Sequence, residues 1–189
     1  MRAQAHTLEG VSAALVVILA VAFTLQATAV TPLTASTASQ HIETQHERAA
    51  SGLLATARED GSLSATLRHW NASNATFRDA GQRGYYVGGP PDTAFGDALA
   101  AAFGDRTIAY NVNAYYITAD GERRQRRVVF QGEPSADAVA ATRTVTLYDR
   151  QRVTGVPDGP TLENATYFGP DAPGPVYAVV DVEVVLWRI

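Results

Sequence analysis

Apolar and polar residues are distributed very unevenly along this chain of 189 residues. Residues 10–40 contain no charged side chain, and the most apolar part is VSAALVVILAVAFTLQATAV, residues 11–30. As a helix, this part spans roughly 30 Å at about 1.5 Å per residue, which matches the hydrocarbon core of a bilayer. A core helix of a water-soluble protein normally keeps a polar face, which this stretch lacks. The pattern therefore predicts a transmembrane helix over residues 11–30.

Residues 31–60 are richer in polar side chains and predict a helical extension outside the membrane. Pro32 should kink or break the helix, because proline removes a backbone hydrogen bond and clashes with the preceding turn. Further along, apolar residues recur near the helical period and predict a thin stripe, at Ile42, Ala49, Leu53 and Ala57. Gly61 is expected to end the helix.

Residues 61–189 predict a globular domain that begins with helical segments. A short helix is expected first, because Leu63, Leu67 and Trp70 have the i, i+4, i+7 spacing of one apolar helix face. After a turn-rich loop, residues 91–103 suit a second short helix with Asp92 or Thr93 as its N-cap. Its apolar face is expected at Phe95, Leu99 and Phe103.

The rest of this domain predicts β-strands. Alternating or β-branched residues indicate four of them, over residues 107–118, 123–131, 138–149 and 176–188. The first two should form a hairpin around Ala119-Asp120-Gly121. In the last strand one face should meet the core, with Val180, Val182, Val184 and Leu186. The opposite face carries Val179, Asp181, Glu183 and Val185.

The predicted fold class is thus α+β, with a long N-terminal transmembrane helix followed by a small antiparallel β-sheet domain packed on helices. Four parts are expected along the chain. They are a leader over residues 1–10, the transmembrane helix over 11–30, its extension over 31–60, and an extracellular α+β domain over 61–189.

Composition and charge narrow the function classes. The chain has 19 acidic residues against 15 basic ones, all of them arginine, and a net charge of −4. Arginine without lysine in an acidic chain resembles proteins of salt-loving archaea. No nucleic-acid partner is expected, because affinity for phosphate comes from clustered positive charge. The absence of cysteine excludes disulfides and thiolate metal sites.

The first residues resemble a known export signal. Arg2-Ala3-Gln4, a few polar residues, Glu9 and then the apolar stretch are similar to the class III signal of archaeal type IV pilin-like proteins. In that family a membrane peptidase cuts after a basic residue plus Gly or Ala and leaves the apolar helix attached. The resemblance implies that Arg2, Ala3 and Gln4 form the processing site. It also implies that Glu9 pairs with the amino terminus of a neighbouring subunit inside an assembly.

The position of the cut stays open by one residue. A cut after Ala3 makes Glu9 the sixth mature residue, whereas a cut after Gln4 makes it the fifth, as in the pilin pattern. Two other interpretations also remain. The stretch could be an uncleaved anchor, or a removed secretory signal with Ala27-Thr28-Ala29 as its cleavage site.

Three tripeptides match the acceptor sequence for N-glycosylation, at Asn71, Asn74 and Asn164. They fit an exported domain. No catalytic set, metal site or cofactor motif is predicted. His41 and His46 are five residues apart, which does not place both on one helix face as a zinc-binding helix requires. The arginines of residues 123–127 alternate between the two faces of a strand and so cannot form one flat patch.

The sequence therefore favours a structural protein over an enzyme. The expected function is that of a membrane-anchored, surface-exposed pilin-like protein, as a pilus subunit or a minor component of a type IV pilus-like or secretion assembly. The expected partners are the lipid bilayer, a prepilin-type peptidase, and copies of itself or other pilin-like subunits. The alternative is a single-pass membrane protein that does not polymerise and uses its extracellular domain for binding.

Overall fold

The computed structural model describes residues 2–104, 107–169 and 174–189, and within its first helix the side chains of residues 9–25 and 40–59. The chain divides into two compact units, Met1–Ile42 and Glu43–Ile189. The first helix, α1 (Arg2–Glu59), begins in the first unit and ends in the second. Gly61, in the left-handed conformation with a φ of 80°, follows its end as the sequence predicts.

The transmembrane helix expected over residues 11–30 is not supported. Among the residues whose side chains are described, no helix is both long enough and apolar enough to cross a membrane. The predicted fold class is corrected accordingly, to an α+β fold with small antiparallel sheets. The side chains of residues 26–39, including Pro32 with its expected kink, lie outside the described residues.

The second unit is built on a four-stranded antiparallel sheet with the strand order β4-β3-β6-β5. Its strands are β3 (Ile108–Ile117), β4 (Arg123–Val129), β5 (Val139–Tyr148) and β6 (Val176–Arg188). All four match the predicted strands within two residues at each end. β3 and β4 form the predicted hairpin, in which Gly121 takes a φ of 81°. β6, the most strongly β-branched segment, lies inside the sheet between β3 and β5.

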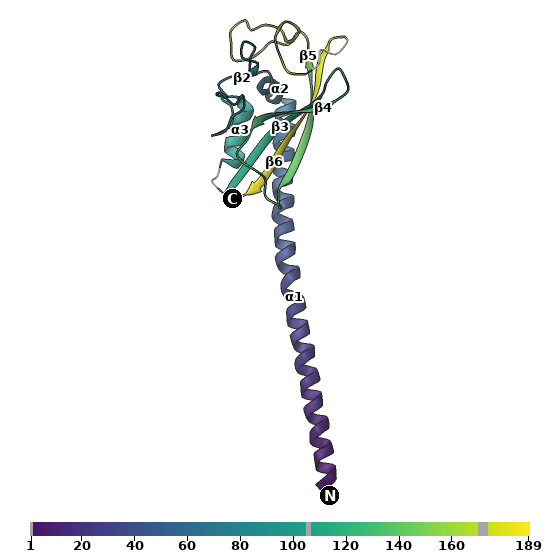
Figure 1. Ribbon diagram of the computed structural model, residues 1–189. Coiled ribbons are helices and arrows are strands. Elements are labelled where there is room, and N and C mark those ends of the chain that lie inside the picture. The colour runs from purple at the N-terminus through teal and green to yellow at the C-terminus, as the bar shows by residue number, and fades with distance from the viewer. Residues whose placement is uncertain (1, 105–106, 170–173) are drawn as a thin grey trace. The chain divides into compact units, whose positions relative to one another are not determined.

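Helices cover one face of this sheet (Figure 1). They are the last part of α1, α2 (Ser62–Leu67) and α3 (Ala94–Phe103), and a short 3₁₀ turn, η1 (Leu162–Asn164), joins the same core. Thr93 is the N-cap of α3, because its hydroxyl accepts a hydrogen bond from the Gly96 amide at 3.2 Å. The predicted core residues of β6 are all buried, with exposed fractions of at most 1%.

The apolar stripe of α1 includes Ala57, as predicted, but its other buried residues lie one position after Ala49 and Leu53. Ala50, Leu54 and Ala57 are buried against the sheet, whereas Ala49 is exposed and Leu53 is half-buried. The spacing of 50, 54 and 57 follows the helical period. Sequence periodicity alone could not distinguish the two adjacent stripes, because both are lined by alanine and leucine.

A small aromatic cluster closes one end of the core. It is organised by a two-stranded hairpin, β1 (Trp70–Asn71) and β2 (Thr76–Phe77), which pairs Trp70 with Phe77. The rings of these two residues meet edge to face at 5.2 Å, and Phe168 lies 5.4 Å from Trp70. The sequence pattern had placed Trp70 on a helix face with Leu63 and Leu67, but α2 ends at Leu67 and Trp70 begins β1. The residues after Trp70 were expected to form a loop, since strands of two residues have no periodicity to detect.

The other face of the sheet is only partly covered. Near one end, the segment after β4 folds over it: Asn111 donates to the Gly132 carbonyl oxygen, and the Gln131 amide donates to Asn111 Oδ1. Asn111 is therefore buried although it is polar. Toward the other end, Ile117 and Val179 stay 51% and 54% exposed. That uncovered part presents the odd-numbered residues of β3 and β6 to solvent.

Candidate functional site

The most unusual surface of the first unit is the apolar part of α1. Over residues 10–25 there is no charged side chain, yet the large apolar residues are 52–74% exposed. Val16, Val17, Ile18 and Leu19 are consecutive and each more than 60% exposed. Because neighbouring residues of a helix are about 100° apart, these four point in all directions around it. The exposed apolar surface thus encircles the helix.

Small residues are interspersed with the large ones on this surface. Gly10 and Ala14 are four residues apart, and Ala20 and Ala22 follow the largest aliphatic residues. A side chain added at Gly10 would meet no atom within 4 Å. Small residues at this spacing let another helix approach closely in an apolar surrounding. The surface can therefore accept helices as well as lipid chains.

Glu9 is exposed and comes directly before the uncharged stretch. It is not free of contacts in the structure. The role of Glu9 as an assembly residue stays a prediction. The proposed processing residues Arg2, Ala3 and Gln4 lie outside the residues whose side chains are described.

The three sequon asparagines differ in their surroundings. Asn71 is half-buried in β1, and its Oδ1 accepts a hydrogen bond from the Ser73 amide at 3.1 Å. Asn74 is exposed in the turn between β1 and β2. Asn164 is exposed at the end of η1, and its Nδ2 donates to Thr161 Oγ1 at 2.8 Å. Asn74 and Asn164 are thus more accessible than Asn71, and glycosylation at all three stays a prediction.

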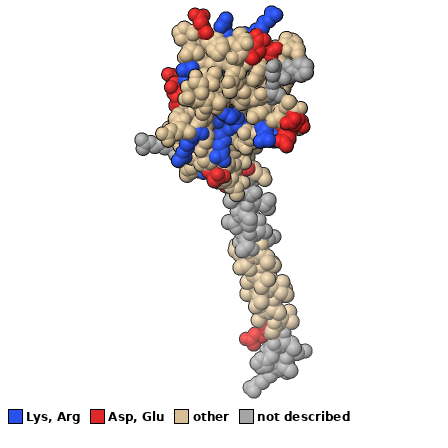
Figure 2. Space-filling model, turned by 45° about the horizontal axis from the view of Figure 1, so that its top comes forward, with Lys and Arg blue, Asp and Glu red and all other residues tan. Residues whose placement is uncertain are grey.

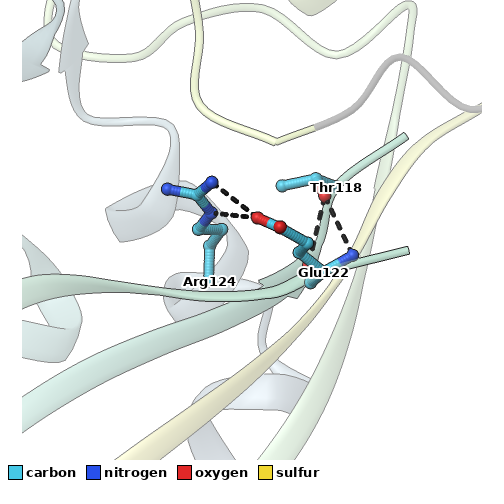
Figure 3. Close-up of polar contacts among 3 residues, drawn as sticks. All are labelled: Thr118, Glu122 and Arg124. Atoms are coloured by element: carbon cyan, nitrogen blue, oxygen red, sulfur yellow. Dashed lines mark hydrogen bonds and ion pairs between the residues drawn. The ribbon is translucent and has the colours of Figure 1, made fainter. Parts of the chain in front are cut away.

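The arginines of β4 divide between the two faces of the sheet, as the sequence predicts. Arg126 points toward the helix-covered face and lies over the Trp70 ring, whereas Arg123 lies on the other face with its guanidinium 4.0 Å from the centroid of Tyr115. Arg124 is held at the hairpin end by Glu122, whose Oε2 accepts from Nη2 at 2.6 Å and from Nε at 3.1 Å (Figure 3).

The same hairpin end is closed by Thr118 (Figure 3). Its hydroxyl accepts a hydrogen bond from the Glu122 amide at 3.1 Å and donates to the Glu122 carbonyl oxygen at 3.3 Å. Glu122 is thereby fixed in place for its ion pair with Arg124. Both charged side chains are about 60% exposed, at 62% and 61%, so this pair is a surface feature with a small effect on stability.

The uncovered sheet face carries a polar network. Glu183 Oε2 accepts hydrogen bonds from the Tyr115 hydroxyl at 2.9 Å and from Asn113 Nδ2 at 3.2 Å. Burial, and then the hydrogen bond and charge of Glu183, raise the pKa of Tyr115. Asp181, the next outward residue of β6, accepts from the Thr144 hydroxyl at 2.7 Å. Hydrogen bonds between neighbouring strands thus hold the carboxylates of Glu183 and Asp181 on this face of the sheet.

We call part of this region the open sheet face and define it by Tyr115, Ile117, Arg123, Arg127, Val179 and Asp181. Sequence alternation already placed Val179 and Asp181 on the side away from the core, and it separated the arginines of β4. The sequence analysis did not single out Tyr115 and Ile117. The same alternation could have identified them, because both are odd-numbered residues of the strand predicted at residues 107–118. In Figure 2, several basic side chains lie close together on one face of the globular part, and acidic side chains lie at separate places around them.

His69 lies next to the aromatic cluster and has structural neighbours. Its carbonyl oxygen accepts from the Arg78 amide at 3.0 Å, and its ring packs close to Gly155. Burial lowers the pKa of His69, and the charge of Arg78 lowers it further. Within the described residues, no group of three or more His, Asp or Glu side chains is placed to hold a metal ion.

The open sheet face and the apolar part of α1 are the two candidate functional surfaces.

Comparison with known proteins identifies a family but no activity. The model of a family described as "Family of unknown function (DUF7288)" matches residues 2–186 of the chain, which includes both candidate surfaces. Among curated proteins and among solved structures, no match was found.

Proposed function

The chain belongs to the DUF7288 family of unknown function, and we propose that it is a pilin-like structural protein of the cell surface. In this proposal it is a pilus subunit or a minor component of a type IV pilus-like or secretion assembly. The observation that carries the proposal is the apolar surface of α1, which is exposed around the whole helix at residues 11–25. A helix that is apolar all round is normally buried by neighbours.

Packing against several other helices would cover this surface on every side. A single partner on one face would leave most of the apolar residues in water, at a cost of about 25 cal/mol per Å² of exposed apolar area. The small residues of the helix allow close approach of neighbouring helices. Copies of this chain or related pilin-like subunits therefore suit the surface better than one binding partner.

The sequence features at the N-terminus support the same function. The resemblance of Arg2-Ala3-Gln4 to a class III signal suggests processing by a prepilin-type peptidase, which would leave α1 with the mature protein. Glu9 would then lie near the new amino terminus and could pair with that of a neighbour, which avoids an unpaired charge in an apolar bundle. The basic residues are all arginine and the acidic residues outnumber them, which favours a haloarchaeal source.

Mass spectrometry of the mature chain from such a host tests the processing. A mature N-terminus at Gln4 or Ala5 supports pilin-like processing with retention of the helix. A mature N-terminus at Val30 would show that the apolar residues 11–25 are removed, and the proposal would then fail.

Assembly is tested by a charge placed in the middle of the apolar surface. Val17→Arg should abolish filaments or higher oligomers, seen by electron microscopy of surface material and by chemical cross-linking, whereas Val17→Leu should preserve them. Glu9→Ala should keep the protein at the cell surface but prevent its incorporation. If the wild-type chain stays monomeric at the surface, the alternative of a non-polymerising surface protein with an extracellular binding domain is favoured instead.

A further inference from the structure

We propose that the open sheet face is the contact surface for a second copy of this chain. The two copies would be related by a two-fold axis that runs along β3 between the stacked sheets. This inference deepens the proposed assembly role and rests on it only for the identity of the partner. It assigns a second, separate contact to the sheet-bearing unit, in addition to the apolar part of α1.

The open sheet face is apolar at the end near the hairpin between β3 and β4. Ile117 and Val179 are large aliphatic residues that remain 51% and 54% exposed on neighbouring strands. Protein interfaces typically combine exposed apolar side chains with polar and charged residues beside them. Aromatic residues and arginine are also enriched there.

Charge is separated across this face. Arg123 and Arg127 lie on β4 along one side of β3, and both are exposed. Asp181 and Glu183 lie on β6 along the other side of β3, and both are half-buried. β3 itself contributes no charged residue, because the positions between the two columns are Asn113, Tyr115 and Ile117. A basic column and an acidic column thus flank a neutral strand.

This arrangement is complementary to itself. A two-fold axis parallel to β3 turns one copy over and exchanges the two sides of its sheet, so that β4 of each copy faces β6 of the other. The basic column of each copy then lies opposite the acidic column of its partner. Such a closed contact uses the same surface twice, which is the commonest arrangement in homo-oligomers.

The strand register makes the match specific. Tyr115 pairs with Gln125 on one side and with Asp181 on the other, so Gln125 and Asp181 lie at the same level along the strands. Arg123 and Arg127 lie two residues to either side of Gln125 on the same face. In the dimer, Asp181 of each copy would therefore point between the two arginines of its partner. Sheets that stack face to face are about 10 Å apart, a distance that extended arginine side chains can bridge.

The carboxylates also disfavour a polyanion on this surface. A nucleic acid or an acidic polysaccharide would gain from Arg123 and Arg127, but it would meet Asp181 and Glu183 across a single strand. Like charges placed against each other in an interface oppose binding. A second copy satisfies both columns at once, which makes it the better occupant.

The chain contains no cysteine, so a single introduced thiol reports contacts without background. Ile117→Cys lies close to the proposed axis and should form an intermolecular disulfide when the full-length chain is oxidised. Gln82→Cys, an exposed position outside the open sheet face, is the matched control and should remain largely monomeric. Equal cross-linking of the two variants would overturn the proposal.

Charge reversal provides a second test that misfolding cannot imitate. In the Ile117→Cys background, Arg123→Glu and Asp181→Arg should each reduce the yield of cross-linked dimer, by roughly tenfold if about 1.4 kcal/mol of association energy is lost. An equimolar mixture of these two charge variants should regain dimer, because each altered residue then faces the opposite charge in its partner. Failure of the mixture to recover would refute the two-fold contact.

The contact between sheets and the assembly through the apolar helix can fail independently of each other. If Val17→Arg abolishes filaments but Ile117→Cys cross-links no better than Gln82→Cys, the apolar helix assembles the protein and the open sheet face does not. If Ile117→Cys still cross-links while Val17→Arg leaves filaments intact, the contact between sheets stands and the role of the apolar helix falls.

Discussion

The guanidinium of Arg126 lies 4.7 Å from the centroid of the Trp70 ring and 5.7 Å from that of Phe168. Its Nη2 also donates a hydrogen bond of 2.6 Å to the Ala75 carbonyl oxygen, in the turn between β1 and β2. Burial lowers the pKa of Arg126, which indicates a site partly shielded from water. This side chain connects the sheet to the aromatic hairpin.

Arg126→Ala should destabilise the second unit. It removes the stacking on Trp70 and leaves the Ala75 carbonyl without its donor, and together these losses should lower the free energy of unfolding by about 2–3 kcal/mol. Arg124→Ala is the matched control on the same strand, because it breaks an exposed ion pair and should cost at most about 1 kcal/mol. Urea denaturation of both variants, followed by circular dichroism, measures the difference. Equal losses would contradict the role assigned to Arg126.

The position of the buried stripe in α1 can be tested in the same way. Leu54 is completely buried and Leu53 is half-buried. Leu54→Ala should therefore reduce the free energy of unfolding by about 2–5 kcal/mol, because it opens a cavity between the helix and the sheet. Leu53→Ala should cost less than half as much. A larger loss at Leu53 would restore the stripe that the sequence pattern predicted.

Features of this fold that depend on neighbouring residues could be predicted from the sequence, whereas features that depend on contacts between distant segments could not. The strands were predictable because alternation and β-branched residues are local features, as in Val180, Val182 and Val184. The burial of Asn111, by contrast, depends on the segment around Gly132, more than twenty residues away. The open sheet face required the register between β3, β4 and β6, which no single segment encodes. The apolar stretch was recognised, but its assignment as a transmembrane helix came from its composition and is not supported by the described helix.

Tyr86 should make the stability of the second unit sensitive to alkaline pH. Its hydroxyl donates to the Arg78 carbonyl oxygen, and burial raises the pKa of Tyr86 to about 12, with a smaller contribution from Asp79. The folded state thus favours the protonated form. This contribution is fully present below the ordinary tyrosine pKa of about 10 and is lost as the pH rises toward 12.

Tyr86→Phe should weaken that pH dependence. The variant loses one hydrogen bond, which costs about 1 kcal/mol near neutral pH. Its free energy of unfolding should then fall less steeply than that of the wild type between pH 10 and 12. Parallel curves for the wild type and Tyr86→Phe would show that Tyr86 does not titrate in this range.

Two glycines in helices should respond in opposite directions to the same substitution. A Cβ at Gly96, in the first turn of α3, would lie 1.8 Å from the Pro91 carbonyl oxygen, whereas a Cβ at Gly52 in α1 would meet no atom within 4 Å. Gly52→Ala should raise the free energy of unfolding by about 0.5–1 kcal/mol, since alanine has the higher helix propensity. Gly96→Ala should instead lower it by about 1–3 kcal/mol, because the loop before α3 must move to make room. Thermal unfolding of both variants gives the signs directly, and stabilisation by Gly96→Ala would mean that Pro91 does not pack against the start of α3.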